Sequence, residues 1–227
     1  MKRGKLKGII TKMITGMLLV FTLVTSCFTA KVYAREDLQY KLQESSIIYK
    51  VGSKRILLDM AHHDTKLDNG CSYGEYNERE IANKITLQVK QLLEAEGIEV
   101  TLTRGEDDVI SIAERIVMAN SADYDYYISI HINSSGTENQ GTGVEAWSNN
   151  AWSLSRKVLK ELENEFDYKY RGIYESKFYN RRIDDKSTIL EIGFLNNKYD
   201  RENLVNHQDR YAQAIARGII EQLRGEE

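Results

Sequence analysis

The sequence predicts a single α/β domain, with a mainly parallel, twisted sheet of about six strands and helices on both faces. Strand-like and helix-like segments alternate from Lys54 onward, which is the order that builds a parallel sheet. Residues 55–59 form a short, mostly apolar run, typical of a strand buried on both sides. Residues 127–133 alternate between isoleucine and other residues, the period-two pattern of a strand.

The strand at residues 127–133 is expected near the centre of this sheet. Tyr124, Tyr126 and Tyr127 lead into it, and aromatic residues favour a pleated, buried surface. His131 lies near its C-terminal end. Ligands of open α/β sheets bind at that edge, so His131 is the first candidate functional residue.

The first helix is expected after a loop at residues 62–76 that is rich in His, Asp, Asn and Gly. Asn77 can cap this helix, and Glu80 stands three residues later, a variant of the capping box. Gly97 ends it. Its apolar residues recur at a spacing of three or four, at Ile81, Ile85, Val89 and Leu92.

The rest of the chain continues the alternation. Further strands are expected at residues 99–103, 143–148 and 188–194. Further helices are expected at residues 110–120, 152–166 and 211–223, each with one apolar side. Residues 35–53 are polar and mixed, and are expected to form a linker with an edge segment at residues 47–49. The folded domain would then occupy residues 54–227.

Residues 1–34 have the composition of a secretory signal peptide. Basic residues precede a mostly apolar run at residues 13–28, and Val32-Tyr33-Ala34 suits a signal peptidase. Two alternatives stay open. One is lipid attachment at Cys27, because residues 24–27 resemble a lipoprotein processing site, and the other is a retained anchor, for which the run is short. We expect a secreted or cell-envelope protein on the extracellular side, with no stable membrane span in its mature form.

Charge and cysteine content exclude two classes of function. Without the leader, 25 Lys and Arg residues stand against 34 Asp and Glu residues, a net charge of −9. Phosphate binding needs a basic surface, so no nucleic-acid partner is expected. Cys27 and Cys71 are too few for a disulfide framework or a cysteine-rich metal site. Any metal would therefore use histidine and carboxylate ligands.

Three residues far apart in the sequence are predicted to meet at one edge of the sheet. His62 follows the first strand, His131 ends the central strand, and Glu78 opens the helix that starts at the same edge. Two histidines and one carboxylate form a typical catalytic zinc set, with the fourth position open to water. Glu191 lies inside an apolar strand, where a carboxylate is costly to bury alone. As a non-ligand it suits a general base that acts on water.

Each of these residues also has an ordinary structural interpretation. A histidine at a strand end is usually satisfied by its surroundings. An acid in the first helical turn is favoured by the helix dipole. Glu191 could form an ion pair with Arg181 or Arg182.

Neighbouring residues compete for the ligand roles. His63 is a rival of His62, although adjacent side chains point in different directions and only one is expected to face a metal. Glu75 similarly rivals Glu78. The fourth histidine, His207, is expected at the surface.

Six segments, in order over residues 55–223, resemble the motifs of the zinc-dependent N-acetylmuramoyl-L-alanine amidases of the cell-wall autolysin and sporulation class (amidase type 3). They are ILLDMAH (56–62), similar to a strand followed by Asp-x-Gly-His; NERE (77–80), similar to a Glu-Lys-Asp helix start; LTR (102–104) with Asp107, similar to a Leu-Thr-Arg…Asp segment; AER (113–115) with Ala119-Asn120, similar to Arg-x-x-x-Ala-Asn; SIHIN (129–133), similar to Ser-Ile-His-x-Asn; and LEIGFLNN (190–197), similar to Glu-x-Gly-Phe-x-x-Asn.

The resemblance implies a zinc-hydrolase-like catalytic domain over residues 54–227, with Zn²⁺ as its cofactor. It implies that His62, Glu78 and His131 are the zinc ligands and that Glu191 is the catalytic carboxylate. The substrate would be peptidoglycan, cut between N-acetylmuramic acid and the first L-alanine of the stem peptide. The alternatives are a zinc peptidase that acts elsewhere on the stem peptide and a non-catalytic wall-binding domain.

The sequence departs from the family pattern at three places. Ala61, His63 and Asp64 replace glycines around the first histidine, so a turn that needs positive φ would be strained and the loop is expected to differ. Lys186-Ser187 stand where the family usually has proline. Only residues 134–142 follow the second histidine before the next strand, so no inserted lid is expected. Because the mature surface is acidic, association with the anionic wall would depend on groove contacts or on another protein, which the sequence does not identify.

Overall fold

The computed structural model describes residues 54–63, 68–184 and 186–225. The expected leader at residues 1–34 and linker at residues 35–53, with its edge segment, lie outside the described residues. None of the helices within the described ranges combines the length and apolar character needed to cross a membrane.

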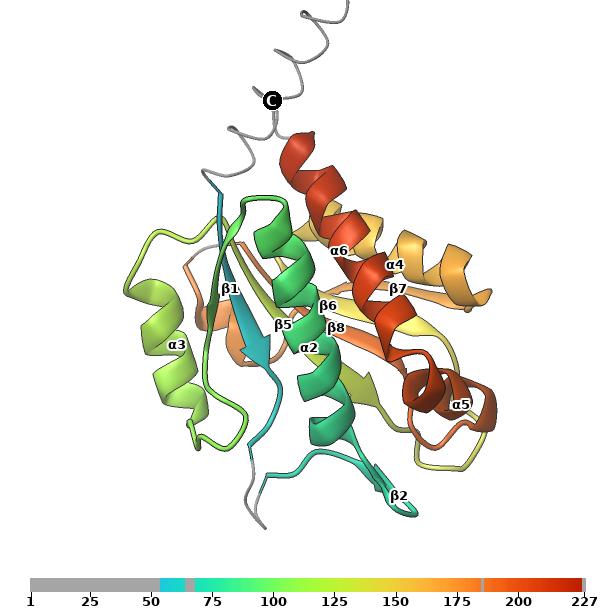
Figure 1. Cartoon of the computed structure of the whole chain (residues 1–227). Helices are drawn as coiled ribbons and strands as arrows, with labels where there is room; N and C mark the ends of the chain where they lie inside the picture. Colours follow the sequence, from blue (N-terminus) through green and yellow to red (C-terminus); the bar gives the residue numbers. More distant parts are fainter. Residues whose placement is uncertain (1–53, 64–67, 185, 226–227) are drawn as a thin grey trace, which may run out of the picture. The chain divides into compact units, whose positions relative to one another are not determined.

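Six strands form one sheet in the order β4-β1-β5-β8-β6-β7 (Figure 1). All neighbouring strands are parallel except β6 and β8. The predicted sheet of about six mainly parallel strands is therefore confirmed. A separate antiparallel hairpin consists of β2 (Ser72–Tyr73) and β3 (Tyr76–Asn77). The strands of the main sheet are β1 (Arg55–Met60), β4 (Glu99–Leu102), β5 (Tyr126–Asn133), β6 (Val144–Asn149), β7 (Tyr170–Glu175) and β8 (Ser187–Phe194).

Helices cover both faces of the sheet, as predicted. On one face lie α2 (Glu78–Ala95), α4 (Trp152–Phe166) and α6 (Gln208–Arg224), with α6 packed between the other two (Figure 1). α5 (Lys198–Asn206) leads into α6. On the other face lie α3 (Ile112–Asn120) and the short 3-10 helix η1 (Tyr179–Arg182), which contact each other. Buried side chains join α3 to β1 and β5, among them Leu57, Ile116, Ala119 and Tyr127.

The direction of the β8 side chains shows which residues face which helices. Ser155 of α4 donates a hydrogen bond of 2.9 Å from its Oγ to Oγ1 of Thr188, so Thr188 points toward α4. Side chains alternate along a strand. Ile189 and Glu191 therefore point toward the opposite face, where α3 and η1 lie.

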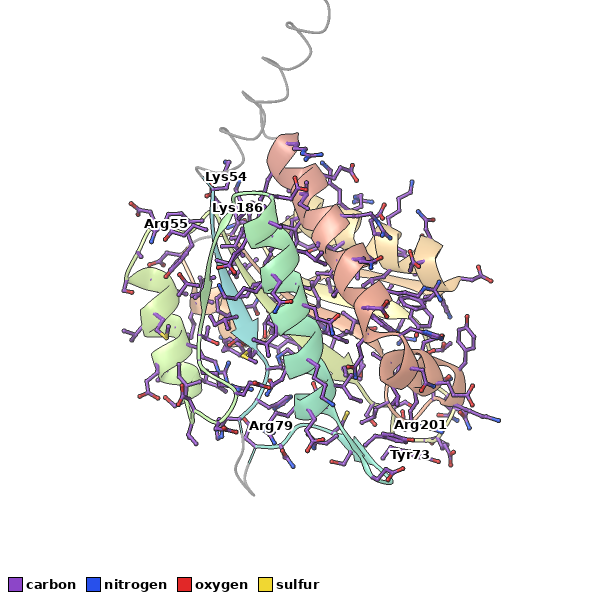
Figure 2. The ribbon with its side chains drawn as sticks, in the orientation of Figure 1. Lys54, Arg55, Tyr73, Arg79, Lys186 and Arg201 are labelled. Carbon is purple, nitrogen blue, oxygen red and sulfur yellow. The ribbon has the colours of Figure 1, made fainter. Side chains whose placement is uncertain are left out.

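The candidate site lies at one edge of the sheet. Because β1, β5 and β8 are parallel, their C-terminal ends meet there. The N-terminus of α2 lies at the same edge, since Asn77 is both the last residue of the hairpin and the helix cap. Figure 2 shows the two ends of the domain: one carries Tyr73, Arg79 and Arg201, and the other carries Lys54, Arg55 and Lys186.

The sequence predicts no element for β7 or α5, and this is wrong for both. β7 is an edge strand with largely exposed or half-buried side chains, so it lacks a clear period-two pattern. α5 buries only Asp200 and Leu204 and has no apolar stripe. The other predicted strands and helices of the described residues are present, with ends that differ from the predicted ones by at most three residues.

Candidate metal centre and catalytic cleft

His62, Glu78 and His131 come together as predicted. Oε1 of Glu78 lies 3.1 Å from Nε2 of His62 and 3.2 Å from Nδ1 of His131. One ligand atom from each residue lies within 4.8 Å of the others. The two imidazole rings pack edge to face, with centroids 4.9 Å apart. Three side chains, from the turn after β1, from α2 and from β5, thus present nitrogen and oxygen atoms to one point.

The local structure fixes Glu78 most firmly. Asn77 caps α2 through its side chain, which accepts a hydrogen bond from the Glu80 amide. Glu78 is the first residue of the helix and is only 4% exposed. Its carboxylate accepts backbone N–H bonds from Ile132 at 2.9 Å and from Cys71 at 2.8 Å. The loop before the hairpin and the end of β5 therefore both hold this carboxylate.

The electrostatics favour a cation at this point. Burial alone would raise the pKa of Glu78, but the imidazoles of His131 and His62 outweigh it and hold the pKa far below its usual range. Burial would lower the pKa of His62, yet the carboxylates of Glu78 and Asp68 raise it to about 9. The cluster thus stabilises positive charge on His62, and a divalent cation would replace that charge when the proton leaves.

The donor set and its dimensions fit zinc. Two imidazoles and one carboxylate are a typical set for a catalytic zinc ion. With zinc–ligand bonds of about 2.0–2.1 Å, tetrahedral ligand atoms lie roughly 3.3 Å apart, and the separations of 3.1 and 3.2 Å come close to this. The other nitrogen of His131, Nε2, is buried and has no hydrogen-bond partner among the residues that the structure describes. Nδ1 of His62 lies 2.5 Å from Oδ1 of Asp68, an outer carboxylate of the kind that orients metal-binding histidines.

The turn after β1 adopts the strained conformation that a glycine would relieve. His62 itself has a φ of 59°, in the left-handed region. Its carbonyl accepts two hydrogen bonds of 2.7 Å, from Nε of Arg104 and from Nη2 of Arg115. Both arginines are about 95% buried or more. The protein therefore keeps the left-handed turn without glycine and holds it by two guanidinium groups.

A buried polar network lies directly beneath this turn. Asp59 is fully buried and forms an ion pair with Arg115. Its carboxylate also accepts hydrogen bonds of 2.6 Å from Thr103 and Ser129, and one of 3.0 Å from Tyr179. Burial would raise the pKa of Asp59, but Arg115 and the hydroxyl groups lower it to about 2. Asp59 therefore stays ionised and fixes the arginine that contacts the His62 carbonyl.

Glu191 lies beside the cluster, on the strand next to His131. The register pairs Glu191 of β8 with His131 of β5 on one side and with Glu145 of β6 on the other. Its Oε2 is buried and, within residues 54–63, 68–184 and 186–225, has no hydrogen-bond partner. Burial raises the pKa of Glu191 to about 7, although His131 opposes the shift. The carboxyl group is thus available to exchange a proton near neutral pH.

The cluster and Glu191 line one open cleft of about 370 Å³. Its other walls are the end of β5, Cys71 and the segment that leads into η1. These walls mix polar and apolar groups, as ligand clefts usually do. Within the described residues, the cleft contains every residue that the sequence assigned to the site: His62, Glu78, His131 and Glu191.

The rival residues lie outside the three-ligand group. Glu75 is exposed in the hairpin turn. His63 points Nε2 to 3.6 Å from Asp68, not to Glu78. Glu191 forms no ion pair with Arg181 or Arg182 in the part of the chain that the structure describes.

Sequence reasoning missed two supporting residues, both in the loop before the hairpin. Asp68 belongs to no periodic segment, so only its loop composition could have indicated a ligand environment. Gly70 has a φ of 70°, and a Cβ there would lie 2.6 Å from Oε2 of Glu78 and 2.8 Å from Cδ2 of His62. The absence of a side chain at Gly70 therefore leaves space for the ligands.

Comparison with known proteins agrees with this geometry. The chain matches the family model described as N-acetylmuramoyl-L-alanine amidase over residues 56–221. It is 28% identical over 172 residues to the N-acetylmuramoyl-L-alanine amidase CwlM of Bacillus licheniformis, which covers 72% of this chain and 65% of CwlM. It is similar to the solved structure of the amidase AmiC2 of Nostoc punctiforme, with a TM-score of 0.70, 27% identity, and coverage of 75% of this chain and 97% of AmiC2. It is also similar to the catalytic domain of CwlV from Bacillus (Paenibacillus) polymyxa var. colistinus, with a TM-score of 0.66, 28% identity, and coverage of 75% and 98%.

Proposed function

The chain belongs to the N-acetylmuramoyl-L-alanine amidase family, and from this premise we propose that it hydrolyses peptidoglycan as a zinc-dependent enzyme. The ligands would be His62, Glu78 and His131, and Glu191 would be the catalytic carboxylate. The scissile bond would join N-acetylmuramic acid to the L-alanine of the stem peptide. The observation that carries the proposal is the meeting of two imidazoles and one buried carboxylate beside a carboxyl group without a partner.

In the proposed hydrolysis, zinc and Glu191 would have different roles. His62, Glu78 and His131 would hold the zinc ion, which would supply a Lewis acid able to lower the pKa of water toward about 7 and to polarise the substrate carbonyl. Glu191 accepts the proton of the attacking water and then delivers it to the nitrogen of the leaving L-alanine. Its raised pKa of about 7 suits both steps, because the group gives up and takes a proton at similar cost near neutral pH.

The proposed cell-wall substrate supports a location outside the cytoplasm. We propose that residues 1–34 are a secretory signal peptide, that residues 35–53 form a linker, and that residues 54–227 are the catalytic domain. The protein would act in the cell envelope or be secreted. Attachment of lipid at Cys27 is the alternative for its N-terminus.

Digestion of purified cell walls with the Glu191→Gln variant tests the proposal. The variant keeps the size and shape of the side chain but removes the proton acceptor. We expect it to bind one zinc ion per chain and to lose at least about 100-fold in hydrolysis rate. Rates come from the release of new N-terminal L-alanine, and zinc content comes from elemental analysis.

The matched control is Glu75→Gln, since Glu75 is an exposed carboxylate of the nearby hairpin. This variant should keep its rate. A chelator should abolish hydrolysis by the unaltered protein, and added zinc should restore it. Undiminished hydrolysis by Glu191→Gln would remove Glu191 from the mechanism, and release of other peptide ends would indicate a peptidase instead.

A further inference from the structure

In the part of the chain that the structure describes, no long helix covers one half of the sheet face that carries Glu191, where the short η1 packs against β6 and β8. α3 packs on β1 and β5, while α4 packs on β6 and β8 from the opposite face. On this open half, the register sets side chains in two rows across the strands. One row holds Glu191, Glu145 and Gly172, and the next row holds Ile189, Trp147 and Tyr174.

The second row forms the base of an aromatic cluster. Trp147 and Tyr174 lie with ring centroids 4.9 Å apart and an interplanar angle of 33°. Phe178 meets Trp147 edge to face at 5.1 Å. Tyr174 is 41% exposed and Phe178 is 40% exposed, so the cluster is open to solvent. We call Trp147, Tyr174 and Phe178 the aromatic platform.

The aromatic platform continues directly from the candidate catalytic cleft. Phe178 and Ile189 line the cleft together with Glu191. Trp147 pairs with Ile189, two positions along the strand from the Glu145–Glu191 pair. Two residues of a strand span about 6.6 Å, which is about the length of one sugar ring. A substrate held at Glu191 would therefore place its next unit over the platform.

We propose that the aromatic platform is a saccharide subsite, which binds a sugar ring of the glycan strand next to the N-acetylmuramic acid at the cleavage point. The proposal rests on the amidase function and adds a specificity determinant to it. Aromatic rings offer flat apolar surfaces that match the C–H faces of pyranose rings. The ammonium group of Lys177 lies 4.5 Å from the centre of the Trp147 ring, where it can donate hydrogen bonds to sugar hydroxyl or acetamido groups.

The carboxylates near the platform add no uncompensated negative charge to it. Glu145 lies in the adjacent row, and Nε of Arg171 donates to it at 2.6 Å, so this pair is neutral as a whole. Glu175 follows Tyr174 on β7, and because side chains alternate along a strand it points to the opposite face. The platform is thus an apolar aromatic surface with one ammonium group, that of Lys177, which suits uncharged sugar rings that carry hydroxyl and acetamido groups.

Intrinsic fluorescence measures binding at the platform without any hydrolysis. The chain has two tryptophans, Trp147 and Trp152. Trp152 is exposed at the start of α4, so Trp152→Phe leaves Trp147 as the only tryptophan. We titrate this variant, with zinc and after chelation, with the tetramer of N-acetylglucosamine. We expect a saturable change in Trp147 emission under both conditions. The control is Trp147→Phe, whose remaining tryptophan, Trp152, should show no change in emission. A flat titration of the Trp152→Phe protein overturns the subsite.

Hydrolysis rates then identify which part of the substrate binds to the platform. The measured quantity is the ratio of kcat/KM for a tetrasaccharide carrying the stem peptide to kcat/KM for muramyl dipeptide. Trp147→Ala should lower this ratio by about tenfold, Trp147→Phe should restore most of it, and Trp152→Ala should leave it unchanged. An equal loss on both substrates, or a loss that follows stem-peptide length, overturns the proposal. Because the fluorescence titration needs no activity, it separates failure of this subsite from failure of the amidase function.

Discussion

The two halves of one sheet face serve different purposes. The covered half, β1 and β5 beneath α3, buries the ion pair of Asp59 and Arg115 under the turn that carries His62. The open half, β8, β6 and β7, carries the buried carboxylate of Glu191 and, beside it, the exposed aromatic rings of Tyr174 and Phe178. A buried, hydrogen-bonded network lies under the proposed metal ligands, and accessible surface lies where we propose that the glycan binds. On these two proposals, the domain separates positioning of the ligands from recognition of the substrate.

The largest expected effect comes from breaking the network of the covered half. Asp59→Asn removes the charge that compensates the buried guanidinium of Arg115. Leaving a buried charge unpaired costs about 3–5 kcal/mol. Urea denaturation should show this loss in the free energy of unfolding. Glu99→Gln is the control, because its ion pair with Arg55 (labelled in Figure 2) is solvent-exposed and should contribute less than about 1 kcal/mol.

The same ion pair predicts how stability depends on pH. The pKa of Asp59 is about 2 in the folded protein, below its ordinary value of 3.8. A lowered pKa means that the folded state favours the ionised form, so the stabilisation is present above about pH 4 and is lost as pH falls toward 2. This part of the acid sensitivity should be absent from Asp59→Asn. Identical acid profiles for the two proteins would contradict the assignment.

An intermediate effect is expected from filling the space beside the ligands. Gly70→Ala would push a methyl group against Glu78 and His62. We expect zinc affinity, measured by competition with a chelating dye, to fall about 10- to 100-fold, as for other changes to the surroundings of metal ligands. Gly74→Ala is a close control, because Gly74 also has positive φ (60°) but no atom within 4 Å of the added Cβ. Like Gly70→Ala, Gly74→Ala should lose about 1–2 kcal/mol in the free energy of unfolding through backbone strain, but it should keep its affinity for zinc.

The sequence predicts the convergence of the ligands because parallel strands bring their C-terminal ends together. His62 and His131 each stand at such an end, and the Asn77 cap places Glu78 at the same edge. Glu191 is predicted because a carboxylate inside an apolar strand is costly to bury unless it is paired or takes part in the chemistry. These inferences need only element type and direction, which the local pattern of residues encodes.

The sequence does not predict the contacts that tertiary structure creates between loops. Asp68 and Gly70 lie in a loop without periodicity, and their relation to His62 depends on the path of that loop. Because glycines are missing around His62, the loop was expected to differ from one with positive φ, yet His62 has a φ of 59° and its carbonyl is held by Arg104 and Arg115. Such support is invisible until the fold brings residues more than 40 positions apart into contact.

The smallest chemical change compares one hydroxyl group in each half. Tyr179→Phe removes a donor to Asp59, a buried carboxylate at 3.0 Å, and should lower the free energy of unfolding by about 1.5–3 kcal/mol. Tyr174→Phe removes an exposed hydrogen bond of 2.9 Å to the carbonyl of Arg171 and should change it by less than about 0.5 kcal/mol. Both proteins keep their rings, so only the hydroxyl contact differs. Equal losses in urea denaturation would show that the two halves do not differ in how firmly their polar groups are held.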